Sequence, residues 1–270
     1  MNSSETSTPT PRAAILRFSK MEANWKAKLS LCAIAALCTA GQARAADFKV
    51  YYPNVTQGEF EFENRAFGTW DRDPARGNER NVTTELGYGV TDYWFAEIEN
   101  EFEKAPQDKW RYHALGLENV FQVTEPGEHY LDLGIFAEYE FAMQRRDSDA
   151  FFVGPILQKQ FGRLLITANL LLNAQFGGDQ PEAPQFNYSL EGKYLLTPMF
   201  QPGFQLFGAP GAFTGFSRLS QQDNRAGPVI FGNLYTAPGK IKYEAGYLIG
   251  LTHDSPSGTL KFLLEYEIAL

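Results

Sequence analysis

Hydrophobic and polar residues alternate with a period of two in segment after segment of this chain. The clearest stretch is "YWFAEIENEFEK", residues 93–104, in which Glu97, Glu99, Glu101 and Glu103 alternate with a mostly apolar set. A helix would bring Glu97 and Glu101 together one turn apart, where like charges repel. A strand places all the glutamates on one face and the apolar set on the other. The stretch is therefore predicted to be a β-strand with one acidic face and one apolar face.

About twelve segments of roughly ten residues share this alternation, and that is the strand length that a transmembrane β-barrel needs. In residues 164–174 the apolar face is continuous over such a length. The stretch "KWRYHALGLENVFQV", residues 109–123, is the least regular, and we expect its phase to shift at a β-bulge. The pattern predicts an all-β fold, an antiparallel up-and-down transmembrane β-barrel of about twelve strands.

A soluble β-sandwich is the alternative, because its strands also alternate between a buried face and a solvated face. The solvated face of such strands meets bulk water and usually carries many lysines. Here the polar face is short-chained, with Asn, Gln, Ser, Thr and Gly, and it carries a surplus of Glu. This composition suits a confined lumen better than an open surface, so the barrel is favoured, with its apolar face toward lipid.

The connections between the segments are alternately short and long. Short turns on one side and longer loops on the other are typical of outer-membrane barrels, where the short turns face the periplasm. An even number of strands returns both termini to the periplasm, so we expect residues 46–58 to be a periplasmic lead-in segment and residues 59–270 to be the barrel. The short turns lie at 91–92, 124–128, 162–163, 197–199 and 237–240, and the longer loops begin at 69, 104, 144, 177, 208 and 252.

The N-terminal region has the order of a secretory signal peptide. Lys26 and Lys28 precede the apolar run of residues 29–40, and small residues follow up to Ala45. The run is too short to span a bilayer as a helix, and a short buried core helix is the alternative. We expect residues 1–45 to be an N-terminal extension and a signal peptide that is cleaved after Ala45.

Composition supports an exported membrane protein. Both cysteines, Cys32 and Cys38, fall in the predicted leader, so the mature chain cannot form a disulfide. Removing residues 1–45 takes away six lysine and arginine residues and two glutamates, and the net charge falls from −8 to −12. Such a charge argues against nucleic acid as a partner. The many phenylalanines and tyrosines, without a long apolar run in the mature chain, favour a barrel in the bacterial outer membrane.

The last strand and several hairpins carry a family resemblance. "FLLEYEIAL", residues 262–270, resembles the C-terminal signal of bacterial outer-membrane proteins, although that signal usually ends in phenylalanine. The resemblance implies the barrel-assembly machinery as a partner. "ELGYGVTDYW", "TEPGEHYLDLGIFAEYEF" and "IKYEAGYLIGLTHDSPSGTLKFLLEYE" resemble uncharacterised proteobacterial outer-membrane β-barrel proteins, some of them grouped with the MetA-pathway phenol-degradation porin-like family. This likeness implies an outer-membrane location and solute uptake, and it carries no catalytic residue.

The charged residues of the polar faces are the candidate functional residues. Carboxylates can bind hard cations, but same-face neighbours on one strand lie roughly 7 Å apart, so a metal site would need ligands from adjacent strands. The alternative, which we favour, is a lumen wall whose carboxylates pair with basic residues across strands. The expected wall has acidic residues Glu97, Glu99, Glu101, Glu138, Glu140, Glu265 and Glu267 and basic residues Arg65, Arg111, Lys193 and Lys242.

Candidate catalytic residues are few. Twelve-strand barrels include an outer-membrane phospholipase, whose family places a histidine two residues before the nucleophilic serine. Among His113, His129 and His253, only His253 is followed by such a serine, Ser255, and it lies in a predicted loop. A solvated loop histidine is the alternative, and we favour it. The chain has no nucleophile elbow, phosphate loop, HExxH motif or paired-cysteine metal site, so we expect neither an enzyme nor a cofactor.

These observations predict a narrow passive channel for small hydrophilic solutes, either cations or neutral molecules. A closed structural or adhesive barrel that uses its loops, particularly residues 208–224, is the second possibility, and a lipid hydrolase is the third. Trp70, Trp94 and Trp110 lie near predicted strand ends, where an interface girdle needs them. A sugar-stacking track is the other interpretation of these aromatic residues.

Overall fold

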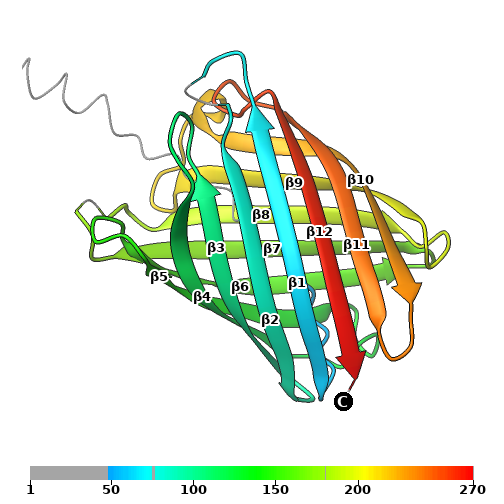
Figure 1. The fold of residues 1–270 in the computed structure, drawn as a ribbon. Coiled ribbons are helices and arrows are strands. Elements are labelled where there is room, and N and C mark those ends of the chain that lie inside the picture. The colour runs from blue at the N-terminus through cyan, green and yellow to red at the C-terminus, as the bar shows by residue number, and fades with distance from the viewer. Residues whose placement is uncertain (1–47, 75–76, 180, 270) are drawn as a thin grey trace, which may run out of the picture. The chain divides into compact units, whose positions relative to one another are not determined.

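The computed structural model describes residues 48–74, 77–179 and 181–269, which form a closed antiparallel barrel of twelve strands (Figure 1). Each strand pairs with its neighbours in sequence, and β1 pairs with β12 to close the cylinder. The predicted up-and-down barrel is therefore confirmed. The strands are β1 Glu59–Trp70, β2 Arg80–Thr91, β3 Trp94–Lys104, β4 Arg111–Gln122, β5 Asp132–Ala142, β6 Asp149–Phe161, β7 Leu164–Phe176, β8 Gln185–Tyr194, β9 Gln201–Ala212, β10 Asp223–Tyr235, β11 Lys240–Gly250 and β12 Gly258–Ala269.

The predicted signal peptide with its cleavage site, and the terminal Leu270, lie outside the described residues. In the part of the chain that the structure describes, no helix is long and apolar enough to cross a membrane. A 3-10 turn, Leu219–Gln221, lies in the loop between β9 and β10.

The alternation of residue types matches the two faces of the barrel wall. On β3 the glutamates are buried, whereas Ile98 is 51% exposed and Phe102 is 44% exposed. The apolar face is thus the outer face, and the polar face lines the interior. This inversion of the soluble pattern arises because lipid, which is apolar, surrounds a transmembrane barrel. Trp70 and Trp110 are exposed at one end of the barrel, beside the longer loops.

Two details of the strands bear on the predictions. Glu101 pairs with Ala114 and Phe102 pairs with Tyr112, so His113 is the extra residue of a bulge in β4. The expected phase shift in this stretch is confirmed. The expected loop at 208–224 is shorter, because β9 continues to Ala212 and β10 begins at Asp223. Its glycine, proline and alanine residues look like a loop in the sequence, yet Asp223 lies opposite Ala209 in the strand ladder.

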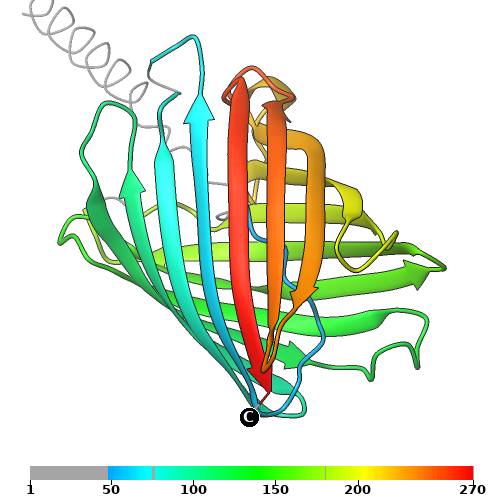
Figure 2. The same cartoon turned by 45° about the vertical axis from the view of Figure 1, so that its right-hand side comes forward.

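The described residues that precede β1 lie inside the barrel. We call residues 48–57 the N-terminal strap; Figure 2 shows it in blue, running behind β11 and β12. The Val55 N–H donates to Gln122 Oε1 at 2.8 Å, and the Gly58 N–H donates to the Gly89 carbonyl at 2.9 Å. Phe48, Val50 and Tyr51 are buried farther along the lumen. The sequence predicts residues 46–58 to be a periplasmic lead-in, but Phe48, Val50 and Tyr51 of this segment are buried within the barrel, which corrects the prediction for this part.

Candidate functional site in the barrel lumen

The ammonium group of Lys49, on the strap, is surrounded by carboxylates from four strands. Its Nζ lies 3.8 Å from Glu63 Oε1, 3.4 Å from Glu97 Oε2 and 3.3 Å from Glu118 Oε2, and it contacts Glu85 directly. These glutamates come from β1, β3, β4 and β2 respectively. All four side chains are buried, and that of Lys49 is 11% exposed. We call Glu63, Glu85, Glu97 and Glu118 the Lys49 site.

Arg65 of β1 joins the same network. Its guanidinium donates to Glu63 Oε1 at 2.9 Å and to Glu99 Oε2 at 2.6 Å, and it contacts Glu85 directly. Glu118 Oε1 is 4.0 Å from the guanidinium. Two cations thus share five buried carboxylates. Because like charges repel strongly where water is excluded, this part of the lumen attracts cations and disfavours anions.

A second network holds Tyr52, also on the strap. Its hydroxyl donates to Glu191 Oε1 at 2.7 Å and accepts from Lys193 Nζ at 2.6 Å. Lys193 is itself 3.1 Å from Glu191 Oε1. Lys261 donates to Gln205 Oε1 at 2.8 Å and contacts both Glu244 and the carbonyl of Phe48. The strap is therefore bound to the β8–β12 side of the wall as well as to the β1–β4 side.

A third network lies at the ends of β11 and β12. Lys242 Nζ lies 2.9 Å from Glu265 Oε1 and also contacts Glu267. Lys240 contacts Glu267 as well. The ladder explains this clustering, because Lys242 lies opposite Glu265, and Lys240 lies opposite Glu267. Cross-strand pairing of opposite charges is the arrangement that stabilises a sheet surface.

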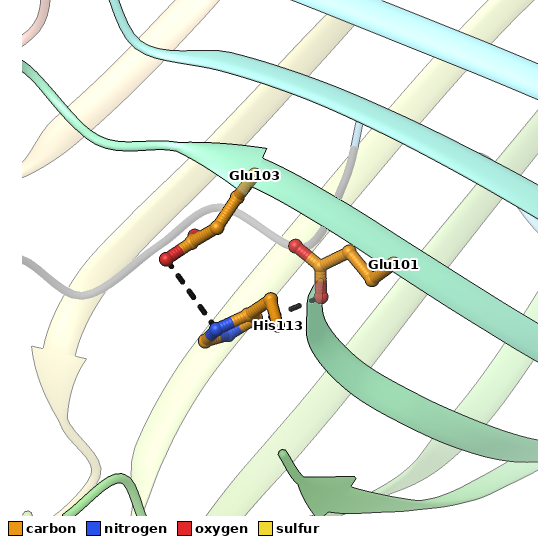
Figure 3. A group of neighbouring side chains, drawn as sticks. All are labelled: Glu101, Glu103 and His113. Atoms are coloured by element: carbon orange, nitrogen blue, oxygen red, sulfur yellow. Dashed lines mark ion pairs between the residues drawn. The ribbon is translucent and has the colours of Figure 1, made fainter. Parts of the chain in front are cut away.

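A fourth group joins Glu101 and Glu103 of β3 to His113 of β4 (Figure 3). His113 Nδ1 is 3.3 Å from Glu103 Oε1, and Nε2 is 4.0 Å from Glu101 Oε2. The bulge at His113 makes this possible, because bulges redirect a side chain. Arg111 donates to Glu103 Oε1 at 2.7 Å and lies 3.0 Å from Asp147 Oδ2. The donor atoms of Glu101, Glu103 and His113 could hold a metal ion, but the Arg111 guanidinium already pairs with Glu103, so the group fits a salt-bridged wall.

The predicted wall residues divide among these networks. Arg65 contacts Glu99, and Lys242 contacts Glu265 and Glu267. Glu138 and Glu140 each have a carboxylate oxygen within 4.8 Å of one of Glu99. The pairs involving Lys193 and Arg111 use glutamates outside the predicted set. Glu97, Glu99, Glu101, Glu138, Glu265, Glu267 and Arg65 are buried, and Glu140, Arg111, Lys193 and Lys242 are intermediate in exposure.

Sequence reasoning missed two features of the lumen. The first is Lys49, because the strap lacks strand periodicity and its sequence indicates a segment outside the barrel. The second is a pair of apolar clusters that hold the strap. The Tyr51 ring stacks on Phe136 with ring centroids 3.9 Å apart, and Phe48 packs edge-on to Phe207 at 5.3 Å. The sequence carries one indication of these clusters. Phe136 of β5 alternates in step with the polar residues of its strand, so an aromatic side chain lies on the inner face.

Beside the strap lies a cavity of about 420 Å³. Its lining includes Lys49 and Tyr52 of the strap together with Glu59 and Glu267, which stand at the ends of β1 and β12. The cavity therefore extends from the barrel end where β1 begins to the Lys49 ammonium. Its other charged walls are Glu61, Glu63, Glu97, Lys193, Lys240, Lys242, Glu244 and Glu265.

His253 and Ser255, the candidate hydrolase motif, make hydrogen bonds within and around their loop. Ser255 is buried, its Oγ accepts from the Asn224 N–H at 2.8 Å, and it donates to the Asn224 carbonyl at 2.9 Å. Its Oγ is also 2.6 Å from Thr252 Oγ1. His253 is turned toward Asp254, with 2.7 Å between Nδ1 and Oδ1, and its side chain is 76% exposed. These bonds tie the loop to β10, which is a role for Ser255 that requires no catalysis.

Comparison with known proteins supports the fold. No family model matches the chain, and no curated protein matches it. The structure is similar to the COG4313 outer membrane channel from Pseudomonas putida F1, with 12% identity and a TM-score of 0.55, covering 85% of this chain and 100% of that chain. It is also similar to the NanC porin, with 10% identity and a TM-score of 0.53, covering 77% and 100%. The fold is thus that of outer-membrane barrels, and the MetA-pathway grouping is not confirmed.

Proposed function

We propose that the protein is a narrow passive channel of the bacterial outer membrane for small hydrophilic solutes, with a preference for cations or neutral molecules. The proposal rests on the acidic interior, in which five buried carboxylates pair with two cations, Lys49 and Arg65. Fixed rings of one charge set the selectivity of a pore. An excess of carboxylates lowers the energy of a passing cation and raises that of an anion.

The membrane location is part of this proposal. Apolar residues cover the outside of the strands, and lipid is the partner that such a surface fits. The barrel-assembly machinery is the proposed insertion partner through β12, whose outward residues include Leu260, Phe262 and Leu264. Export by the predicted signal peptide precedes insertion.

The strap limits the channel. Phe48, Val50 and Tyr51 of the strap are buried inside the barrel, where Lys261 of β12 and Asn169 of β7 bind its backbone. Solutes therefore pass when the strap moves aside. A barrel whose strap never moves would be closed, and this same packing favours the closed structural barrel as the second candidate function.

Planar-bilayer recording tests the proposal. The refolded protein is expected to give ohmic current steps, with a reversal potential under a KCl gradient that indicates cation preference. Replacing Glu97, Glu99 and Glu101 by glutamine preserves side-chain size and is expected to reduce that preference. An absence of conductance under all conditions would favour the closed barrel, and anion preference would contradict the acidic-wall mechanism.

A further inference from the structure

We infer that the Lys49 site is a receptor for a primary ammonium group, occupied in this structure by the Lys49 ammonium as a tethered ligand, and that small primary alkylammonium ions bind there in place of that ammonium. The inference deepens the proposed function, because it names the class of cation that the lumen recognises. It rests on that function only for its consequence on conduction, since binding can be measured without current.

The geometry of the Lys49 site suits an ammonium ion. A primary ammonium is a compact charge with three N–H donors, so it can serve several acceptors arranged around it. Carboxylate oxygens of Glu85, Glu97 and Glu118 lie within 4.8 Å of one another, and each comes from a different strand. The Lys49 Nζ lies 3.3–3.4 Å from two of them and contacts the third.

The Lys49 ammonium lies beside a guanidinium and an aromatic ring. Arg65 already supplies the planar guanidinium, which is bound to Glu63, Glu85 and Glu99. The position of Lys49 Nζ is separate from it, and the ring of Tyr51 lies with its centroid 5.3 Å from this nitrogen. An aromatic face within about 6 Å attracts a cation. The barrel wall thus supplies the buried carboxylates of the Lys49 site, and the strap itself supplies the aromatic face beside the ammonium.

The ligand is replaceable because the strap stands apart from the strand ladder. Its Tyr51 and Val55 N–H groups donate to the side chains of Asn169 and Gln122, not to a strand backbone. Departure of the strap would leave the closed ring of strand pairing intact. The cavity beside it is lined by Lys49, Glu63 and Glu97, so a small ion can approach from the barrel end where β1 begins.

Chemical rescue of a Lys49→Ala variant tests the inference. Alanine removes the side chain beyond Cβ, and propylammonium has the matching shape and charge. Lys49→Met is the control, because its side chain fills the stem volume and carries no ammonium. The full barrel in detergent would be titrated with propylammonium chloride, and with tetramethylammonium chloride or NaCl at the same ionic strength.

The readout is the position of the strap. The chain has no cysteine after residue 45, so a cysteine placed at the buried Val50 reports strap exposure through its rate of reaction with a maleimide. We expect slow labelling in the otherwise unchanged barrel, faster labelling with Lys49→Ala, and a return toward the slow rate only with propylammonium. With Lys49→Met, propylammonium is expected to have no effect.

Several results would overturn the inference. Lys49→Ala could leave the labelling rate unchanged, or propylammonium could fail to restore the slow rate. Tetramethylammonium or sodium could also restore the slow rate as well as propylammonium does. Adding Glu97→Gln and Glu118→Gln to Lys49→Ala is expected to weaken the response, and an undiminished response would also count against it. A barrel without conductance that still shows the rescue would refute the proposed function alone, and conductance without rescue would refute the ammonium site alone.

Discussion

Tyr51 and Asn169 form two reciprocal hydrogen bonds across the lumen. The Tyr51 N–H donates to Asn169 Oδ1 at 2.9 Å, and Asn169 Nδ2 donates to the Tyr51 carbonyl at 2.9 Å. The side-chain amide thus pairs with the strap as a neighbouring strand would. Both residues are buried. Asn169 of β7 in this way provides hydrogen-bond partners for the backbone of the strap, which pairs with none of the described strands.

Removing this amide is expected to loosen the strap. Asn169→Leu leaves a buried donor and acceptor of Tyr51 unsatisfied, and each such group costs about 1–3 kcal/mol. The labelling rate of a cysteine at Val50 would rise in this variant. Asn173→Leu on the same strand is the comparison, because among the described residues no hydrogen bond joins Asn173 to the strap, and the rate should stay nearly unchanged. Equal rates in Asn169→Leu and the parent would contradict the role of the amide.

A side chain at Gly134 is expected to displace the strap. A Cβ at this position would lie 2.9 Å from both Cα and Cβ of Pro53, closer than atoms pack. Gly134→Ala should therefore expose the strap to protease and increase any conductance. Gly192→Ala is the matched control, because no heavy atom lies within 4 Å of the added carbon there. Identical behaviour of both variants would argue against close packing at Pro53.

The buried charge network predicts an unequal effect of two arginine substitutions. Arg65→Met leaves several carboxylates without their guanidinium, and breaking a buried ion pair on one side costs about 3–5 kcal/mol. Arg146→Met breaks a pair with Asp179 whose side chains are 88% and 69% exposed, so the loss should be at most about 1 kcal/mol. Urea unfolding in detergent, followed by heat-modifiable gel migration, compares them. Similar losses would contradict the buried network.

The outer face of β3 predicts a membrane effect. Ile98 is 51% exposed and lies near the middle of its strand, where lipid is expected. Ile98→Arg should destabilise the inserted barrel by about 2–4 kcal/mol, the cost of arginine at the bilayer midplane. Ile98→Val keeps the apolar surface and should change little. Folding into vesicles over a urea series measures both, and a tolerated arginine would contradict the assignment of the outer face.

The sequence predicted what depends on local periodicity. The acidic row of β3 turned to the inside of the barrel because residues alternate along any strand, and the irregular phase around His113 marked its bulge. The contacts of Lys49 could not be predicted this way. They depend on closure of the ring and on the register of four strands, neither of which is encoded in one segment. The strap itself has no period that would identify its partners.

The central claim is that the acidic lumen conducts cations when the strap no longer occupies it. The most direct measurement is the reversal potential and conductance, in a planar bilayer under a KCl gradient, of a variant that lacks residues 48–56. The structure predicts larger ohmic currents than those of the parent barrel, with potassium favoured over chloride. An absence of conductance in bilayers that contain the correctly folded variant, or currents carried mainly by chloride, would contradict this claim.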